Sequence, residues 1–375
     1  MKNYVFSCIL IVLFHHQAYS QAQTDTNATS AIDFRPSLAT RTLTFSAYTE
    51  AWYGFDFNRP AGNTLPAFIY SHNRHNEVNI NFAYIKAYYS RDRVHSSLAL
   101  ATGTYMNANY AAEPGLLKNV YEANAGVKLS ARKDVWLDVG VLPAHIGFES
   151  ARSVDCPTLT RSIIADNSPY YESGARLSYT SANAHWYMAG LVLNGWQRIQ
   201  RPDGNSAFAA GTQLTYTPSE HVTLNYSTFL GSDRPDSIRQ TRIFHNLYGI
   251  FHITDRLGAT IGFDYGIEQQ YKGSTAWNNW MGGALILQYK TGRKTAVALR
   301  GEYYDDKHGV IVVTHIPDGF TVAGYSANFD YHIMEHVLWR TEAKLLKSPN
   351  TVFTRHDGTP TDVTPLATTS LAIDL

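Results

Sequence analysis

Cysteine is nearly absent from this chain, which contains two among 375 residues. Cys8 lies inside the first apolar segment, so the rest of the chain keeps only Cys156 and can form no intramolecular disulfide. A lipid anchor would need its cysteine directly behind that apolar segment, and Cys8 does not occupy such a position. We therefore expect a fold that is held together without disulfides or a lipid anchor.

Long apolar runs are absent after the N-terminal region, which excludes a helical membrane protein. The exception is YVFSCILIVLF, residues 4–14, which follows a lysine and precedes the small residues Ala18 and Ser20. This arrangement is typical of a secretory signal peptide over residues 1–20. Residues 21–40 are rich in Thr, Ser, Ala and Gln without a period, which predicts a flexible periplasmic lead-in.

An excess of charge of either sign is also lacking, because 31 lysines and arginines balance 31 aspartates and glutamates. A nearly neutral chain gives no reason to expect a nucleic-acid partner. The sequence has no P-loop, no dinucleotide fingerprint and no Gly-x-Ser-x-Gly motif, and its 15 histidines show no zinc-ligand spacing. We therefore expect no enzymatic activity, no metal and no cofactor.

The pattern that is present is an alternation of apolar and polar residues in segments of about nine to eleven residues. It predicts an all-β chain of about 16 strands, or 14 if two weak segments, 280–290 and 320–332, are misread. The first segment begins at Leu43. The others are expected near 76–89, 94–105, 119–130, 135–141, 170–180, 185–194, 206–217, 221–231, 242–253, 256–267, 280–290, 294–305, 320–332, 336–346 and 366–375.

Short and long connections alternate along these segments. The short ones are polar, such as SRDR at 90 and TGRK at 291, whereas the long ones include 58–75, 106–118 and 142–169. Such a regular alternation means that the two ends of the sheet face different surroundings. It is typical of a transmembrane antiparallel up-and-down β-barrel with short periplasmic turns and long extracellular loops, here over residues 41–375.

Charged residues avoid one face of the alternating segments, as expected if that face meets lipid, where a lysine or arginine costs roughly 2–4 kcal/mol at the bilayer midplane. Lys86 falls on the lipid side by this phase, and Arg242 fits neither face. The opposite face is predicted to form a polar pore wall. Its candidate residues are Glu50, Glu122, Lys128, Glu172, Arg176, Arg300, Glu302, Arg340, Glu342 and Lys344.

Two neighbouring stretches resemble the OmpL-like putative β-barrel porin family. They are DVGVLPAHIGFES, from Asp138 to Ser150, and DNSPYYESGARLSYT, which begins at Asp166. Where that family typically has a Gly-Lys-Phe-like element, this chain has Gly140, Val141 and Leu142. The resemblance implies an outer-membrane channel in a Gram-negative-type bacterium.

The longest predicted connection, 142–169, has 28 residues, and loops of this length are usually functional or disordered. We expect it to fold into the barrel and narrow the pore, with an outward-facing surface loop as the alternative. Its charged and titratable residues would then face wall charges such as Arg300 and Glu302. The candidate constriction residues are His145, Glu149, Arg152, Asp155 and Arg161.

Sixteen strands enclose an interior too wide for wall side chains alone to fill. The sequence therefore predicts a porin for passive diffusion of ions and small hydrophilic solutes, surrounded by outer-membrane lipid. A homotrimer is expected by analogy with diffusion porins. The alternative is a barrel that serves as a surface receptor or adhesin through its extracellular loops.

Overall fold

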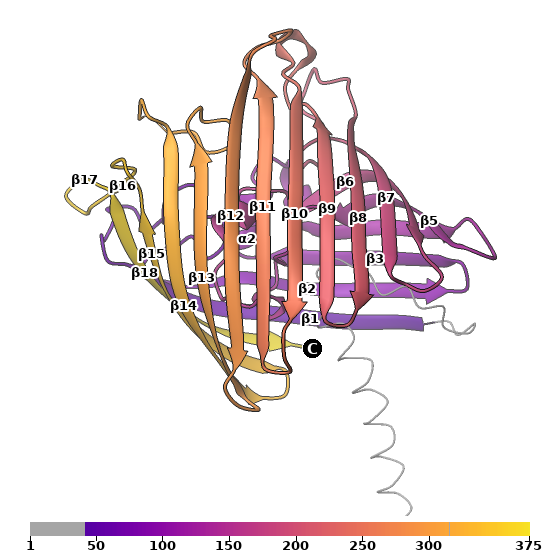
Figure 1. The fold of residues 1–375 in the computed structure, drawn as a ribbon, viewed down its shortest axis with the longest axis horizontal. Helices are drawn as coiled ribbons and strands as arrows, with labels where there is room; N and C mark the ends of the chain where they lie inside the picture. Colours follow the sequence, from indigo (N-terminus) through magenta and orange to yellow (C-terminus); the bar gives the residue numbers. More distant parts are fainter. Residues whose placement is uncertain (1–41, 315) are drawn as a thin grey trace, which may run out of the picture.

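The computed structural model describes residues 42–314 and 316–375, so the expected signal peptide and lead-in lie outside the described residues. Sixteen antiparallel strands form one closed barrel in which each strand pairs with its neighbours along the chain, and the last strand closes on the first (Figure 1). Its strands are β1 (Thr42–Asp56), β2 (Val78–Arg91), β3 (Val94–Thr102), β4 (Val120–Lys128), β5 (Asp134–Pro143), β6 (Tyr171–Thr180), β7 (Trp186–Leu193), β8 (Ala209–Ser219), β9 (Val222–Gly231), β10 (Arg242–His252), β11 (Leu257–Gln269), β12 (Trp277–Lys290), β13 (Thr295–Asp306), β14 (Phe320–Met334), β15 (Val337–Lys347) and β18 (Val363–Asp374).

The predicted all-β barrel of sixteen strands is confirmed. The alternative of fourteen is wrong, because the two weak segments form β12 and β14. The front strands in Figure 1 cross the strands behind them at a steep angle, as expected when tilted strands close into a barrel. No helix in the described part of the chain is long and apolar enough to cross a membrane.

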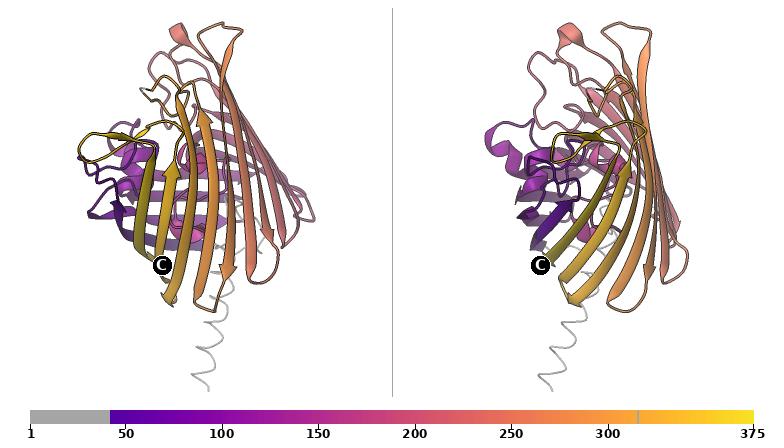
Figure 2. Two further views of the ribbon diagram at one scale, coloured as in Figure 1. Left: turned by 60° about the vertical axis from the view of Figure 1, so that its left-hand side comes forward. Right: turned by 90° about the vertical axis from the view of Figure 1, so that its left-hand side faces the viewer.

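Short and long connections alternate as predicted, and they define a turn end and a loop end of the barrel. Figure 2 shows the wall from the side, with the long connections gathered at one end. These connections contain the remaining elements of the described chain. They are α2 (Thr104–Asn109), η1 (Gly115–Asn119), η2 (Ser153–Asp155), α3 (Ile163–Asp166), η3 (Asp236–Ile238) and a small hairpin of β16 (Phe353–Thr354) and β17 (Pro360–Thr361).

Alternation along each strand separates an outward apolar face from an inward polar one, because successive side chains point to opposite sides of a sheet. On β13, Leu299 is 60% exposed whereas the next residue, Arg300, is 2% exposed. The same contrast recurs between Leu345, which is exposed, and the buried Lys344 on β15. The outward face is therefore the apolar surface of the barrel.

A β-bulge in β2 corrects the expectation for Lys86. Glu50 of β1 pairs with Phe82, but the next residue, Ala51, pairs with Ile80, so Asn81 is an extra residue in β2. One extra residue reverses the facing of every residue that follows it. Lys86 consequently points inward, where its ammonium lies 3.0 Å from the Glu122 carboxylate.

Candidate functional site

The connection between β5 and β6 spans residues 144–170, and we call it the inner loop. It crosses the barrel interior, because its backbone amides donate hydrogen bonds to inward side chains on three strands. Leu159 donates to Asn328 of β14 at 3.1 Å, Thr160 to Glu342 of β15 at 2.6 Å, and Ile163 to Glu302 of β13 at 2.7 Å.

The start of the inner loop is held against another part of the wall. The His145 ring lies 2.8 Å from the Glu172 carboxylate through Nδ1 and 2.8 Å from the carbonyl oxygen of Thr228 through Nε2. The amide of Gly147 donates to the side-chain oxygen of Asn246 on β10. The loop is therefore attached to the wall on both of its flanks, which a freely projecting surface loop would not require.

Glycines in the inner wall leave space for inner-loop side chains. A Cβ atom added at Gly211 of β8 would lie 2.6 Å from the His145 ring, and one at Gly262 of β11 would lie 2.1 Å from the Phe148 ring. On β12, a Cβ atom at Gly282 would lie 2.5 Å from Ile164. Distances under 3.0 Å are not tolerated by real side chains, so each glycine forms a socket for one loop residue.

Arg340 of β15 is the strongest single attachment of the inner loop to the wall. Its guanidinium donates to the carbonyl oxygens of Ser153, Cys156 and Thr158, and it also bonds the Asp330 carboxylate at 2.7 Å. The arginine is fully buried. Hydrogen bonds from a charged donor are about twice as strong as those between neutral groups.

Arg300 and Lys344 form a second group of attachments. Arg300 donates to the hydroxyl of Thr158 and to the carbonyl of Thr160, and it pairs with Glu342 at 2.9 Å. Lys344 donates to the carbonyl of Arg161 and lies 3.0 Å from Glu302. Arg300 and Lys344 bond wall carboxylates as well as the inner loop, so little of their charge is exposed in the lumen.

The middle of the inner loop reaches the seam where the barrel closes. Ser153 donates to Glu50 of β1, whose other carboxylate oxygen lies 3.2 Å from the His72 ring. Arg152 bonds Asp374, the penultimate residue of the chain, at 2.5 Å. The loop thus links the first and the last strand of the barrel.

Arg161 stabilises the fold of the inner loop itself. Its guanidinium donates to the backbone carbonyls of Ser150, Ala151 and Leu159, and the side chain is fully buried. Glu149 accepts a hydrogen bond from the amide of Ser162, the N-cap residue of α3, and its second oxygen lies 3.9 Å from Arg300.

The five candidate constriction residues therefore differ in what they face. Glu149 lies near Arg300 as expected, whereas Arg152 pairs with Asp155 and Asp374. His145 pairs with Glu172. All five are buried or half-buried.

Three wall candidates bond other wall residues rather than the inner loop. Glu122 pairs with Lys86, and Lys128 pairs with Asp134 at 2.7 Å. Arg176 bonds Asp138, which also accepts from the His95 ring at 2.6 Å. The inward residues that the sequence did not identify here are His95 and Lys86.

Two further connections also enter the loop end of the lumen, which the sequence did not predict. Phe68 and Ile69 of the β1–β2 connection pack with Ile146, Phe148 and Ile164 of the inner loop in one apolar cluster. A second cluster contains Tyr105, Met106 and Tyr110 from α2 and its C-cap. The available signal was the apolar and aromatic content of LPAFIY (65–70) and TYMNANY (104–110).

Solvent exposure returns towards the turn end. The inward residues Thr44, His252, Lys290 and His332 are exposed, whereas inward residues near the inner loop are almost all buried. Side chains are thus packed most closely at the loop end of the lumen, and the turn end is exposed to solvent. Within the described residues, no group of three His, Cys, Asp or Glu side chains is arranged to hold a metal ion.

Two titratable groups in the inner loop are perturbed by their surroundings. Burial raises the pKa of Asp166 to about 7, against the opposing effect of Lys344 and Arg161. Burial alone would lower the pKa of His145, but the Glu172 carboxylate raises it above its usual value. The loop therefore favours a protonated Asp166 and a charged His145.

Solved structures of similar fold include outer-membrane porins and channels, and at these identities the likeness concerns the fold alone. The anion-selective porin from Comamonas acidovorans is 6% identical, with a TM-score of 0.61, covering 90% of this chain and 100% of that one. The outer-membrane channel DcaP of Acinetobacter baumannii is 9% identical, with a TM-score of 0.57, covering 91% and 99%. The trimer form of OmpT, an outer-membrane protein of Vibrio cholerae, is 11% identical, with a TM-score of 0.53, covering 90% and 100%.

Comparison with curated proteins gives no significant match. The family model described as "Putative beta-barrel porin-2, OmpL-like" matches residues 42–375, which is the whole barrel. The barrel has sixteen strands, an apolar outer face and polar inner-wall residues that bind the inner loop. Because the family model matches this whole barrel, the chain belongs to this family of outer-membrane porins.

Proposed function

We propose that this porin is a passive channel for ions and small hydrophilic solutes and that the inner loop is its constriction. The observation that supports this most directly is that Arg300 and Arg340 donate hydrogen bonds to backbone carbonyl groups of the inner loop inside the barrel. Three of the loop's titratable groups lie beside wall groups of opposite sign: His145 beside Glu172, Glu149 beside Arg300, and Arg152 beside Asp374. We therefore propose weak selectivity between anions and cations.

Planar-bilayer recordings of the purified protein test this proposal. We expect discrete ohmic steps in potassium chloride, a reversal potential close to zero in a salt gradient, and loss of permeation for neutral sugars above a small size. A strong preference for one sign of ion would contradict the proposed selectivity. Absence of any conductance would contradict the channel itself and favour a surface receptor acting through the extracellular loops.

We also propose a homotrimer, as in the trimer form of the Vibrio cholerae OmpT structure. The outer faces of β1, β15 and β18 carry small residues at mid-height, such as Ala51, Ala343 and Ala367. Flat surfaces of this kind allow close approach of neighbouring barrels. The same recordings test this, because a trimer opens in three equal steps whereas a monomer opens in one.

The conductance is expected to rise as the pH increases from about 4 to 8. The pKa of Asp166 in the docked loop is raised to about 7, so docking is strongest below the ordinary aspartate pKa of about 4 and weakens as the pH rises towards 7. The raised pKa of His145 acts in the same direction, because the charged ring that pairs with Glu172 is lost on deprotonation.

The Asp166→Asn variant separates the two contributions to this pH dependence. Asparagine cannot ionise, so the variant should show a smaller rise in conductance between about pH 4 and 7 than the unmodified protein. The exposed Asp203→Asn serves as the control and should leave the pH profile unchanged. A pH profile that is identical in all three proteins would contradict the assignment.

A further inference from the structure

Buried polar atoms without a hydrogen-bond partner recur where β1, the β1–β2 connection, α2 and the end of the inner loop meet. They are the indole nitrogen of Trp52, the hydroxyls of Ser71, Tyr105 and Tyr170, Nδ1 of His72 and the side-chain oxygen of Asn167. We call these six residues the neutral cluster. Because native proteins pair nearly all of their buried polar groups, each unpaired atom requires an explanation.

His72 links the β1–β2 connection to the wall and to α2. Its amide donates to the side-chain oxygen of Asn81 in the β2 bulge at 2.9 Å, and the Thr104 hydroxyl of α2 donates to the same oxygen at 3.3 Å. The Trp52 ring lies edge-on to the His72 ring, with 5.1 Å between the centroids. The φ angle of His72 is 54°, a left-handed conformation that persists only where its surroundings hold it and that is frequent at ligand sites.

The end of the inner loop completes this circuit of contacts. The Tyr170 ring packs against the Tyr105 ring of α2, with 5.4 Å between the centroids. The amide of Ser71 donates to Asp166 at 3.2 Å, and the side-chain amide of Asn167 donates to a backbone carbonyl of the β1–β2 connection at 3.0 Å. The six members of the neutral cluster are therefore brought together by direct contacts between their segments.

The groups that lack partners are uncharged, and the acids beside them are already engaged. Glu50 bonds Ser153 and Asn81 and lies 3.2 Å from the His72 ring. Burial raises the pKa of Asp166 to about 7, so this carboxyl is largely neutral at mildly acidic pH. An ion therefore finds no free charge of opposite sign in the cluster. A hydroxyl group of a solute can both donate and accept a hydrogen bond, which suits the mixture of donors and acceptors present here.

The neutral cluster lies on the less firmly held side of the inner loop. Within the described residues, two hydrogen bonds join the inner loop to the β1–β2 connection, those of Ser71 and Asn167, in addition to apolar packing. On the side of β13 and β15, Arg300, Arg340 and Lys344 hold the loop through charged donors. Because such bonds are about twice as strong as neutral ones, a movement of the loop should separate it first from the β1–β2 connection.

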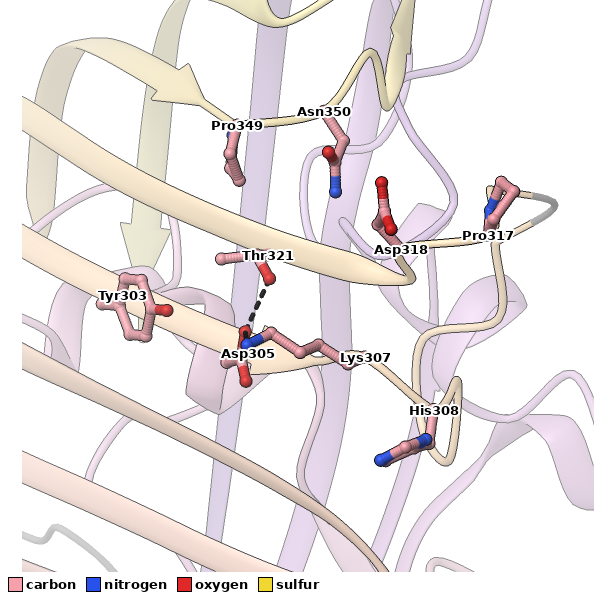
Figure 3. A pocket seen from close by; sticks show the side chains of 9 residues that line it. All are labelled: Tyr303, Asp305, Lys307, His308, Pro317, Asp318, Thr321, Pro349 and Asn350. Atoms are coloured by element: carbon pink, nitrogen blue, oxygen red, sulfur yellow. Dashed lines mark hydrogen bonds and ion pairs between the residues drawn. The ribbon is translucent and has the colours of Figure 1, made fainter.

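An open pocket elsewhere at the loop end has a different chemistry. This outer pocket, with a volume of about 550 Å³, is lined by residues from the ends of β13 and β14 and from the connections that follow β13 and β15. Figure 3 shows Thr321, Asp305 and Lys307 grouped together. Thr321 donates to Asp305 at 2.6 Å, and the Lys307 ammonium lies 3.9 Å from the same carboxylate. The described residues that line it include no buried polar atom without a partner, so the outer pocket provides a control position.

We propose that the neutral cluster binds small neutral polyols, such as glycerol and erythritol, as they pass the inner loop. This inference rests on the channel function proposed above. Hydroxyl groups of the polyol supply the missing partners of His72 and Asn167, and the rings of Trp52 and Tyr105 provide apolar surface for its carbon chain. Binding of this kind makes the passage of polyols saturable, whereas simple diffusion through a pore is not.

Tracer flux of labelled erythritol into proteoliposomes that contain the intact protein tests this proposal, with potassium chloride conductance recorded from the same preparation. The flux should level off as the erythritol concentration rises. A flux that stays proportional to concentration, in a preparation that conducts potassium chloride, would overturn the binding site and leave the channel standing. Absence of both conductance and flux would overturn the channel and the site together.

Two tyrosine variants locate the binding in the neutral cluster. Tyr105→Phe and Tyr170→Phe each remove a hydroxyl that has no partner in the protein, so the thermal midpoint should not fall. Each should raise the half-saturating erythritol concentration about fivefold, the effect of about one neutral hydrogen bond. Tyr271→Phe, at an exposed position on the β11–β12 connection, and Lys307→Gln in the outer pocket should leave that concentration unchanged. Unchanged half-saturation in both cluster variants would overturn the assignment.

Discussion

Replacing Arg340 by glutamine is expected to release the inner loop and to raise the single-channel conductance several-fold. Arginine at this position bonds three carbonyl groups of the loop and the carboxylate of Asp330, all of them buried. Losing a charged hydrogen-bond donor costs about 1.5–3 kcal/mol for each bond to the loop. Since 1.4 kcal/mol corresponds to a factor of ten, the undocked loop should become roughly a hundredfold or more better populated.

Arg176 provides the matched control for this experiment. It is also a buried, inward-facing arginine with an aspartate partner, Asp138, but its bonds go to the wall and not to the inner loop. Arg176→Gln should therefore cost stability without opening the lumen. Heat-modifiable mobility reports whether each barrel is folded, and equal conductance in the two variants would contradict the role of Arg340.

Enlarging Gly262 should also displace the inner loop, by a different physical route. A Cβ atom there would lie 2.1 Å from the Phe148 ring, and a leucine would occupy the socket completely. Overpacking of a filled interior typically costs 1–3 kcal/mol. We expect Gly262→Leu to raise the conductance and to increase proteolytic cleavage within the inner loop.

Two further variants decide whether the effect of Gly262→Leu comes from the socket. A Cβ atom at Gly301, on the outward face of β13, meets no atom within 4 Å, so Gly301→Leu should leave the conductance unchanged. Adding Phe148→Ala to Gly262→Leu removes the clash and should restore the low conductance. Failure of this second change to compensate would mean that the leucine distorts the wall itself.

The strands were predictable because lipid imposes a strict local rule on them. Charged residues are excluded from one face, so apolar and polar residues alternate along each strand. This alternation alone predicts that Arg300 faces inward, because its neighbour Leu299 faces outward. The prediction failed at β2, where the single extra residue Asn81 reverses the facing of Lys86. A bulge interrupts the alternation of apolar and polar residues, so no periodic pattern marks its position.

The contents of the lumen were much harder to predict. The inner loop was identified by its length, but its bonds join residues far apart in the chain, such as Arg152 and Asp374, which are separated by 222 positions. Pairings of this kind form only in the folded barrel, and no characteristic spacing along the sequence indicates them. The contribution of Phe68 and Tyr105 to the filling of the lumen was missed for the same reason.

The link between the inner loop and the closing seam sets an order of events during assembly. Arg152 requires Asp374 of β18, which lies beside β1 only in the closed barrel, so this bond cannot form before the last strand has joined the first. Long-range contacts of this kind form late, because the loop-closure entropy must be overcome first. The seating of the inner loop is therefore complete only when the circle of strands is closed.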